Sequence, residues 1–271
     1  MKMKNTTLVD KAVDIAKNYE TTYIWGGIGL PITAATIQRA EKAYSKNTTA
    51  GYAAAAKKLS GNPKAFYFDC IGLIKSILWG WNGDANKTYG GAKYASNSVP
   101  DIGADATITK CSEVSTKFTN SMVPGEVVWC KGHIGIYIGD GLAVECTPKW
   151  QNGVQVTAVG NLGKKSGYNT RYWTKHGKLP WVDYSGVIVV AGGAKTVNVN
   201  LNVLKRGDKG PQVKAAQALL VNAGFGVGSY GCDGSFGRDT QNAVMKLQAA
   251  KKLLHHNGEI DAQTWAALLG K

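Results

Sequence analysis

A stretch of small and β-branched residues without aromatic side chains, GVIVVAGGAKTVNVN, occupies residues 186–200. Segments of this composition bury little surface and are typical of linkers, although this one has enough β-branched residues to carry a short strand. The length of 271 residues suits one or two domains of about 150 residues each. The sequence therefore predicts an N-terminal domain over residues 1–185, a linker over 186–200 and a C-terminal domain over 201–271.

Composition excludes several classes of protein. Hydrophobic residues make up 44% of the chain, enough for a packed core, so disorder is excluded as the main state. No apolar run approaches the roughly 20 residues of a membrane-spanning helix. Asp10 and Asp14 stand where a signal peptide has its apolar core. We therefore expect a protein made in the cytoplasm, without a signal peptide or a membrane span.

The cysteine spacing excludes two kinds of site, and the net charge restricts the class of binding partner. Five widely spaced cysteines without a C-x-x-C pair do not fit a disulfide scaffold or a four-cysteine zinc site, so most are expected to be reduced. The net charge of +14 extends over both predicted domains and suits an anionic partner. No aromatic and basic RNA-binding signature or finger spacing accompanies the charge, so nucleic acid is not the expected partner.

The C-terminal domain has the hydrophobic pattern of three short helices. Apolar residues recur at helical spacing over residues 211–223 and 238–254, and Asp261 is a suitable N-cap for a third helix. The residues expected to face the core are Val213, Ala216, Leu219, Leu220, Ala223, Val244, Leu247, Leu254, Trp265, Leu268 and Leu269. A small all-α bundle with a modest core is expected.

A cysteine at the start of an apolar helix is the strongest chemical signal in the N-terminal domain. In FYFDCIGLIKSILWG, residues 66–80, apolar residues recur at helical spacing after Cys70, and Asp69 is a natural N-cap. The free N–H groups and the dipole at a helix N-terminus favour a thiolate and can hold an oxyanion. The alternative is that Cys70 is a small core residue, the commoner role of a cysteine among apolar neighbours.

Two alternating segments within residues 124–148 predict an antiparallel hairpin. The apolar faces of the two strands agree if a three-residue loop at 139–141 pairs Gly135 with Glu145, whereas a two-residue loop mixes them. His133 is then the diagonal neighbour of Glu145, within side-chain reach, and Gly135 leaves the space between them open. Such a carboxylate can fix the imidazole tautomer while the other ring nitrogen faces a thiol. The alternatives are a half-exposed strand histidine and a solvated glutamate at a strand end.

A zinc site would use the C-x-x-H spacing of Cys130 and His133. No third and fourth ligand follow at a suitable spacing, and on a continuous strand Cys130 would point to the opposite face from His133. We therefore expect neither a metal nor a cofactor. His176, His255 and His256 lack comparable sequence contexts.

The C-terminal domain resembles a peptidoglycan-binding domain of the three-helix type. The similarity lies in LKRGDKGPQVKAAQALLVNAGF, DGSFGRDTQNAVMKLQ and GEIDAQTWAALL, and it covers nearly all of residues 201–271. Its most specific part is an Asp-Gly-x-Phe-Gly turn before a Thr-x-x-Ala-Val helix. Asp233, Gly234 and Gly237 in this turn are equally compatible with a structural role, so it is the resemblance that implies binding to the cell wall.

The N-terminal domain resembles the NlpC-like family of papain-related cell-wall cysteine hydrolases over most of residues 8–185. Three motifs occur in the family's order: Tyr23-Ile24-Trp25-Gly26-Gly27, Asp69-Cys70-Ile71-Gly72-Leu73, and Pro124-Gly125-Glu126 leading to His133-Ile134-Gly135-Ile136-Tyr137-Ile138-Gly139. The resemblance implies an α+β, papain-like fold in which the cysteine helix packs on an antiparallel sheet. It further implies Cys70 as nucleophile, His133 as base and Glu145 as orienting group, with Tyr23 and Asp69 supporting the oxyanion and substrate.

Three departures from the family pattern affect the expected specificity. Ile71 replaces a serine that helps recognise the substrate in the family, and Glu145 stands where a second histidine is common. Residues 28–65 form a long insertion with two Ala-rich helical stretches, which is either a lid or specificity wall or a structural ornament.

Together the resemblances imply a phage-type lysin that reaches the wall after the membrane is permeabilised and cuts an amide bond of peptidoglycan through a thioester. The family favours the bond between D-glutamate and the diamino acid of the stem peptide. Several phage lysins instead act as N-acetylmuramoyl-L-alanine amidases, and the change at Ile71 leaves both bonds open. A function of another class is a non-catalytic wall-binding protein with a degenerate hydrolase domain.

Overall fold

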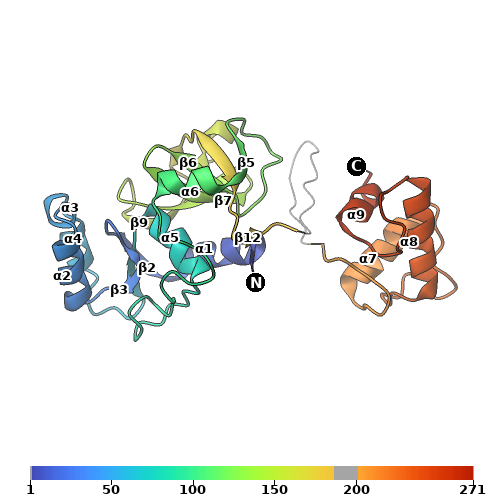
Figure 1. The fold of residues 1–271 in the computed structure, drawn as a ribbon, viewed down its shortest axis with the longest axis horizontal. Helices are drawn as coiled ribbons and strands as arrows, with labels where there is room; N and C mark the ends of the chain where they lie inside the picture. The colour runs from blue at the N-terminus through green and yellow to red at the C-terminus, as the bar shows by residue number, and fades with distance from the viewer. Residues whose placement is uncertain (1, 186–200, 271) are drawn as a thin grey trace. The chain divides into compact units, whose positions relative to one another are not determined.

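The computed structural model describes residues 2–185 and 201–270 (Figure 1). It divides into two units, and the boundary between them in the sequence falls between Tyr184 and Ser185. The predicted linker, residues 186–200, lies outside the described residues. The first unit is a mixed α+β structure and the second is helical, so each is described by itself.

The first unit is built around a seven-stranded sheet in the order β10-β9-β8-β7-β6-β11-β5. Neighbouring strands are antiparallel, apart from the parallel pair β10 and β9. Alternation along β7 and β8 sends Ile134, Ile136 and Val144 into the core. The strands are β5 (Ser112–Ser115), β6 (Val127–Cys130), β7 (His133–Gly139), β8 (Leu142–Thr147), β9 (Gly153–Val159), β10 (Thr170–Arg171) and β11 (Lys175–Lys178).

Two helices, α1 (Asn5–Asn18) and α5 (Cys70–Leu78), pack against each other and against this sheet. Every residue of α5 is buried, which confirms the predicted buried helix after Asp69. Each fully buried aliphatic side chain, such as Leu73 or Ile77, contributes about 1.5–3 kcal/mol to folding, so α5 is held firmly in place. Within residues 2–185 and 201–270, no helix is long and apolar enough to span a bilayer.

The insertion and the chain on either side of it form a smaller layer. A three-stranded sheet has the order β2-β4-β3, and the insertion helices lie beside it (Figure 1). They share a small core that includes Ile37, Ala56 and Tyr67. The remaining elements of the unit are β1 (Met3–Lys4), β2 (Glu20–Tyr23), β3 (Ile28–Pro31), α2 (Ala34–Ala43), α3 (Lys46–Thr49), α4 (Tyr52–Lys57), β4 (Ala65–Phe68), α6 (Ala104–Lys110), the 3-10 helix η1 (Gly160–Leu162) and β12 (Val182–Asp183).

The register of β7 and β8 is the predicted one, but the loop differs. Tyr137 pairs with Ala143, as expected, and the register shifts between Tyr137 and Gly139, where Gly139 pairs with Leu142. The connection is therefore a two-residue turn at Asp140-Gly141, with both residues at positive φ, rather than a three-residue loop. The extra residue sits in a β-bulge, and this bulge keeps both apolar faces on the same side.

The second unit contains the three predicted helices, α7 (Pro211–Asn222), α8 (Arg238–Ala250) and α9 (Ala262–Leu268). Asp261 caps α9 by accepting a hydrogen bond from the Thr264 N–H, as predicted. The prediction for the end of α8 was wrong: the helix stops at Ala250, Lys252 has a positive φ, and Leu254 is 83% exposed. Ala223 is exposed as well, because it lies beyond the last turn of α7.

Two buried glutamines of the second unit make equivalent hydrogen bonds. The Gln217 side chain on α7 accepts from the Gly234 N–H and donates to the Thr240 hydroxyl. The Gln248 side chain on α8 likewise accepts from the Gly258 N–H and donates to the Thr264 hydroxyl. Each glutamine thus ties a helix to the turn and helix start that follow it, which places the Asp-Gly-x-Phe-Gly turn in a structural role.

Candidate functional site

The start of α5 is fixed by Asp69, which bridges two of the sequence motifs. Its Oδ1 accepts a hydrogen bond of 2.5 Å from the Gly72 N–H, and its Oδ2 accepts one of 2.9 Å from the Gly26 N–H. The N–H of Asp69 itself donates to the Gly27 carbonyl at 2.8 Å. The Trp-Gly-Gly segment is therefore bound to the helix that begins with Cys70.

The Cys70 sulfur lies beside β7. The backbone N–H of Ile134 donates toward it, as do those of Ile71 and Cys70 itself. Ile134 follows His133 directly in the chain, so the structure brings the predicted cysteine and the predicted histidine segment together. Tyr23 is only 5% exposed and lies close enough to Cys70 for the two to interact electrostatically.

Burial dominates the acidity of Cys70. Desolvation, reinforced by the nearby Asp69 carboxylate, raises the pKa of the Cys70 thiol to about 12, although the three N–H groups act to lower it. The N–H groups at the start of the helix act in favour of the thiolate, as expected, but burial outweighs them. The thiol is protonated at neutral pH and needs a base before it can act as a nucleophile.

Glu145 lies at the centre of a buried polar network. Its carboxylate is fully buried, and Oε2 lies 2.7 Å from Nε2 of His133, so the diagonal contact predicted from the register is present. Oε1 accepts a hydrogen bond of 2.7 Å from the Thr157 hydroxyl. Burial acts to raise the pKa of Glu145, but the hydrogen bonds from His133 and Arg171 outweigh it and hold that pKa below its usual value. The alternative of a solvated strand end does not apply.

Two side chains of this network were missed in the sequence. Arg171 Nε donates to both oxygens of Glu145, at 2.7 and 2.9 Å. The ring of Trp173 stacks on the imidazole of His133 with centroids 5.6 Å apart and planes 9° apart. Both residues come from the chain around β10, where nothing in the pattern signals a role in the site.

Gly135 provides the room that the network needs, as predicted. A Cβ atom at this position would lie 3.0 Å from the Val144 carbonyl oxygen and 3.2 Å from the Trp173 ring. Any larger residue would therefore push apart the strand pair and the ring that supports His133.

Cys130 and His133, the two residues considered for a zinc site, do not face opposite sides as a continuous strand would place them. Cys130 and His133 are not on one continuous strand: a turn at Lys131-Gly132 separates β6 from β7, and the two residues pair directly across the hairpin. Directly paired residues share a face, so Cys130 lies on the side of His133. Among residues 2–185 and 201–270, however, no group of three or more potential ligands is arranged for a metal.

His176 has a partner that its sequence context did not suggest. Its Nδ1 bonds to Glu126, in the third motif, and its Nε2 lies 3.0 Å from the Lys117 carbonyl oxygen. Burial acts to lower the pKa of His176, but the bonds to Glu126 and Lys117 outweigh it and raise the pKa above its usual value. This pair ties β11 to the start of β6 and is separate from the Cys70 region.

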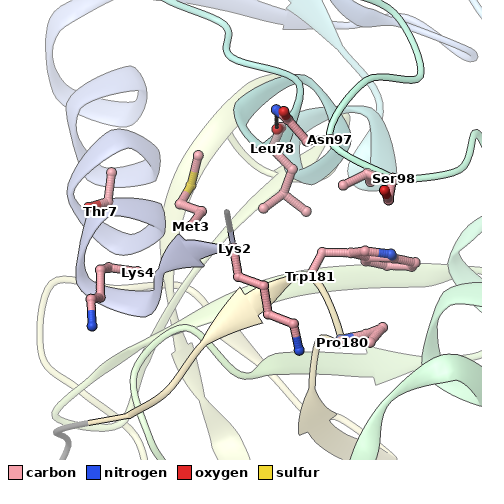
Figure 2. A pocket seen from close by; sticks show the side chains of 10 residues that line it. Lys2, Met3, Lys4, Thr7, Leu78, Asn97, Ser98, Pro180 and Trp181 are labelled. Atoms are coloured by element: carbon pink, nitrogen blue, oxygen red, sulfur yellow. Dashed lines mark hydrogen bonds between the residues drawn. The ribbon is translucent and has the colours of Figure 1, made fainter.

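A cavity of about 470 Å³ opens at Cys70; Tyr23, Asp69 and Ile71 also line it, whereas His133 and Glu145 are not part of its lining. A different cavity, of about 620 Å³, is shown in Figure 2; Met3, Leu78 and Trp181 line it, and its lining contains no cysteine, histidine or carboxylate. Of these two cavities, the one at Cys70 therefore contains the predicted nucleophile.

Comparison with known proteins supports a cell-wall role. Residues 209–268 match the family of putative peptidoglycan binding domains, which confirms the resemblance of the C-terminal domain. A probable N-acetylmuramoyl-L-alanine amidase of Bacillus licheniformis is 41% identical over 61 residues, 22% of this chain and 17% of its own. The N-acetylmuramoyl-L-alanine amidase CwlL of the same organism is 32% identical over 123 residues, 36% of this chain and 34% of its own.

Among solved structures, a peptidoglycan-binding protein from Clostridioides difficile in complex with glutamine hydroxamate is 40% identical. The match covers 25% of this chain and 40% of that chain, with a TM-score of 0.23. The matches to the two amidases and to this structure thus each cover about a third or less of this chain.

Proposed function

We propose that this protein is a peptidoglycan amidase of the NlpC-like, papain-related type found in phage lysins, with Cys70 as its nucleophile. The observation that carries the proposal is that the Cys70 sulfur lies beside β7, the strand that begins with His133, while His133 is paired with the buried Glu145. The predicted C-terminal domain, residues 201–271, would hold the enzyme on the wall and so raise the local concentration of substrate at Cys70.

His133 is the group that activates the thiol in this proposal. Its Nε2 is held by Glu145, so Nδ1 is the ring nitrogen left to receive a proton. As sulfur attacks the carbonyl carbon, the thiol proton passes to Nδ1 and a tetrahedral oxyanion forms. The N–H groups of Cys70 and Ile71 at the start of α5, with Tyr23 nearby, would stabilise that oxyanion.

The oxyanion then collapses to a thioester. The carbon–nitrogen bond breaks, and the proton on His133 goes to the leaving amine. Water attacks the thioester and gives one proton to His133, which passes it to sulfur as the carbon–sulfur bond breaks. The products are the free thiol and a carboxylic acid, which then releases its proton to become a carboxylate. The reaction consumes one water molecule and needs no metal ion or cofactor.

The bond favoured is the amide between the lactyl group of N-acetylmuramic acid and L-alanine. The named relatives that this chain resembles in part are N-acetylmuramoyl-L-alanine amidases. This reverses the preference for the D-glutamyl bond that the sequence motifs implied. Ile71, which replaces the serine of the family motif, lines the cavity, consistent with a changed substrate contact.

Purified walls digested by the protein and analysed by mass spectrometry test this proposal. We expect new amino termini on L-alanine and peptide-free muramic acid, and a loss of at least about a thousandfold in rate for Cys70→Ala. New amino termini on the diamino acid would make the protein an endopeptidase. Unchanged lysis by Cys70→Ala would overturn the proposal. Absence of lysis by the parent despite wall binding would also overturn it and would favour a non-catalytic wall-binding protein.

A further inference from the structure

The cavity at Cys70 adjoins a second space that is formed in part by the insertion. This space has a volume of about 430 Å³ and includes Arg39 and Tyr89 in its lining. Five residues line both spaces, namely Trp25, Gly26, Ile28, Tyr44 and Asp101. One cleft therefore runs from the nucleophile to helix α2, and its size suits a small organic ligand.

Aromatic rings dominate the far part of this cleft, and three of them are unusually exposed. Trp25, Tyr44 and Tyr94 are 40%, 47% and 48% exposed, although large aromatic side chains are normally mostly buried. Tyr67 and Tyr89 complete the set. Lys46 Nζ lies 3.9 Å from the centroid of the Trp25 ring, and Tyr94 packs against Trp79 and Tyr89 with centroids 5.1 and 5.9 Å apart. Partly exposed rings inside a cleft are typical of a ligand site.

Polar groups lie at the edges of these rings. Arg39 donates to the Tyr89 hydroxyl at 3.3 Å, and its guanidinium lies over the Tyr89 ring. Asp101 accepts a hydrogen bond of 2.6 Å from the Tyr94 hydroxyl and is also paired with the buried Lys75 of α5. The lining thus combines apolar ring faces with hydroxyl, guanidinium and carboxylate groups.

The insertion holds the tryptophan of this wall in place. Asn47 on α3 is fully buried; its side chain accepts from the Trp25 N–H at 2.8 Å and donates to the Trp25 carbonyl at 3.1 Å. A third bond, to the Ala40 carbonyl at 2.9 Å, ties the same side chain to α2. Because Asn47 bonds both the N–H and the carbonyl of Trp25, it fixes the backbone that carries the indole ring before a ligand binds. Of the roles open for residues 28–65, this arrangement favours a specificity wall.

We propose that this aromatic part of the cleft binds the N-acetylated sugar ring that carries the stem peptide. The C–H faces of a pyranose stack on the negative faces of aromatic rings. Its hydroxyl and acetamido groups match the donors and acceptors of Arg39, Asp101 and the tyrosine hydroxyls. Stem peptides of small and charged residues have no flat apolar face for these rings.

The position of the sugar site beside Cys70 also bears on which amide bond of peptidoglycan is cut. The inference rests on the proposed function, since it describes the acyl side of the same cleft. In a muramoyl–L-alanine amide the sugar's lactyl group becomes the acyl group on sulfur, so the sugar must lie next to Cys70. In the D-glutamyl bond two amino acids separate the sugar from the scissile carbonyl, and a neighbouring sugar site would have no use.

Binding of the peptide-free disaccharide of N-acetylglucosamine and N-acetylmuramic acid tests the inference by calorimetry. The full-length Cys70→Ala protein serves as parent, and Tyr44→Ala and Arg39→Met are added to it singly. We expect each addition to weaken the cleft-dependent binding about tenfold. Tyr168→Ala, which removes a tyrosine of similar exposure outside the cleft, should leave affinity unchanged. Because all variants keep the C-terminal unit, any binding there is common to them.

Equal disaccharide affinity in the parent and in both added variants would overturn the inference. Tighter binding of a sugar-free stem tetrapeptide, lost in the same variants, would also overturn it and assign the cleft to peptide. Either outcome can occur while Cys70→Ala abolishes wall hydrolysis, so failure of the sugar site is distinguishable from failure of the proposed function. Circular dichroism melting of Tyr44→Ala and Arg39→Met checks that both variants remain folded.

Discussion

Nε2 of His133 lies 2.7 Å from Oε2 of the fully buried Glu145, whose two oxygens also accept from Arg171. The carboxylate is therefore paired with the guanidinium as well as with the imidazole. Such a carboxylate can fix the orientation and tautomer of His133. A neutral imidazole is the form that can accept a proton from a thiol.

Arg171→Met should shift the acid side of the pH profile of wall hydrolysis to higher pH. Arg171 helps to hold the pKa of Glu145 below its usual value, so its loss lets the carboxyl protonate at a higher pH. We also expect the free energy of unfolding at pH 7 to fall by about 3 kcal/mol, because a buried charge loses its partner. Wall hydrolysis from pH 4 to 8 and urea unfolding are the measurements. Lys164→Met, at an exposed position of the first unit, is the control; an unmoved acid limb would argue against this role of Arg171.

Stability should also depend on pH through His176. Its pKa is raised in the folded state, so its contribution is complete below the unfolded value of about 6.5 and is lost as pH rises through the folded value. The melting temperature of the first unit should therefore fall as pH rises from neutral to alkaline. His176→Gln should remove this part of the pH dependence of the melting temperature. Melting curves from pH 6 to 9 measure it, with the exposed His255→Gln as control. An identical slope in both variants and the parent would contradict the assignment.

Much of the N-terminal site was predictable because alternation in strands restricts register strongly. A shift by one residue would turn Ile134 and Ile136 to the wrong face, so the pattern alone placed His133 beside Glu145. The bulge near Gly139 was not predictable, since a two-residue turn with a bulge and a three-residue loop give the same faces. The hairpin turn at Lys131-Gly132 was missed, although its glycine at positive φ is a turn signal.

Other features depend on contacts that no local pattern records. Arg171 reaches Glu145 from 26 positions further along the chain, and its neighbourhood has neither periodicity nor a motif. The pKa of Cys70 is a balance between helix N–H groups and burial, and only the folded structure shows how complete that burial is. Leu254 fits the helical spacing of α8, but the helix ends before it reaches that position.

Gly72→Ala should damage both stability and activity. A methyl group at this position would lie 1.8 Å from the Gly27 carbonyl oxygen, a backbone atom held by the Asp69 N–H. Relief requires α5 to move away from the Trp-Gly-Gly segment, at a cost of about 3 kcal/mol or more, and this displaces Cys70. Thermal unfolding and wall hydrolysis report the two effects. Gly226→Ala, where a Cβ would meet no atom within 4 Å, should behave as the parent, and a stable, active Gly72→Ala protein would contradict the close packing.

The dependence of Cys70 on a base can be measured without any substrate. Because burial raises the pKa of the thiol to about 12, almost none of it is ionised at pH 7 unless its proton moves to His133. Iodoacetamide should therefore alkylate Cys70 at least about tenfold more slowly in His133→Ala than in the parent. Peptide mass spectrometry gives the rate at each cysteine, and Cys232, in the second unit, is an internal reference that should react equally in both proteins. Equal rates at Cys70 would show that His133 does not receive the thiol proton and would remove it from the proposed mechanism.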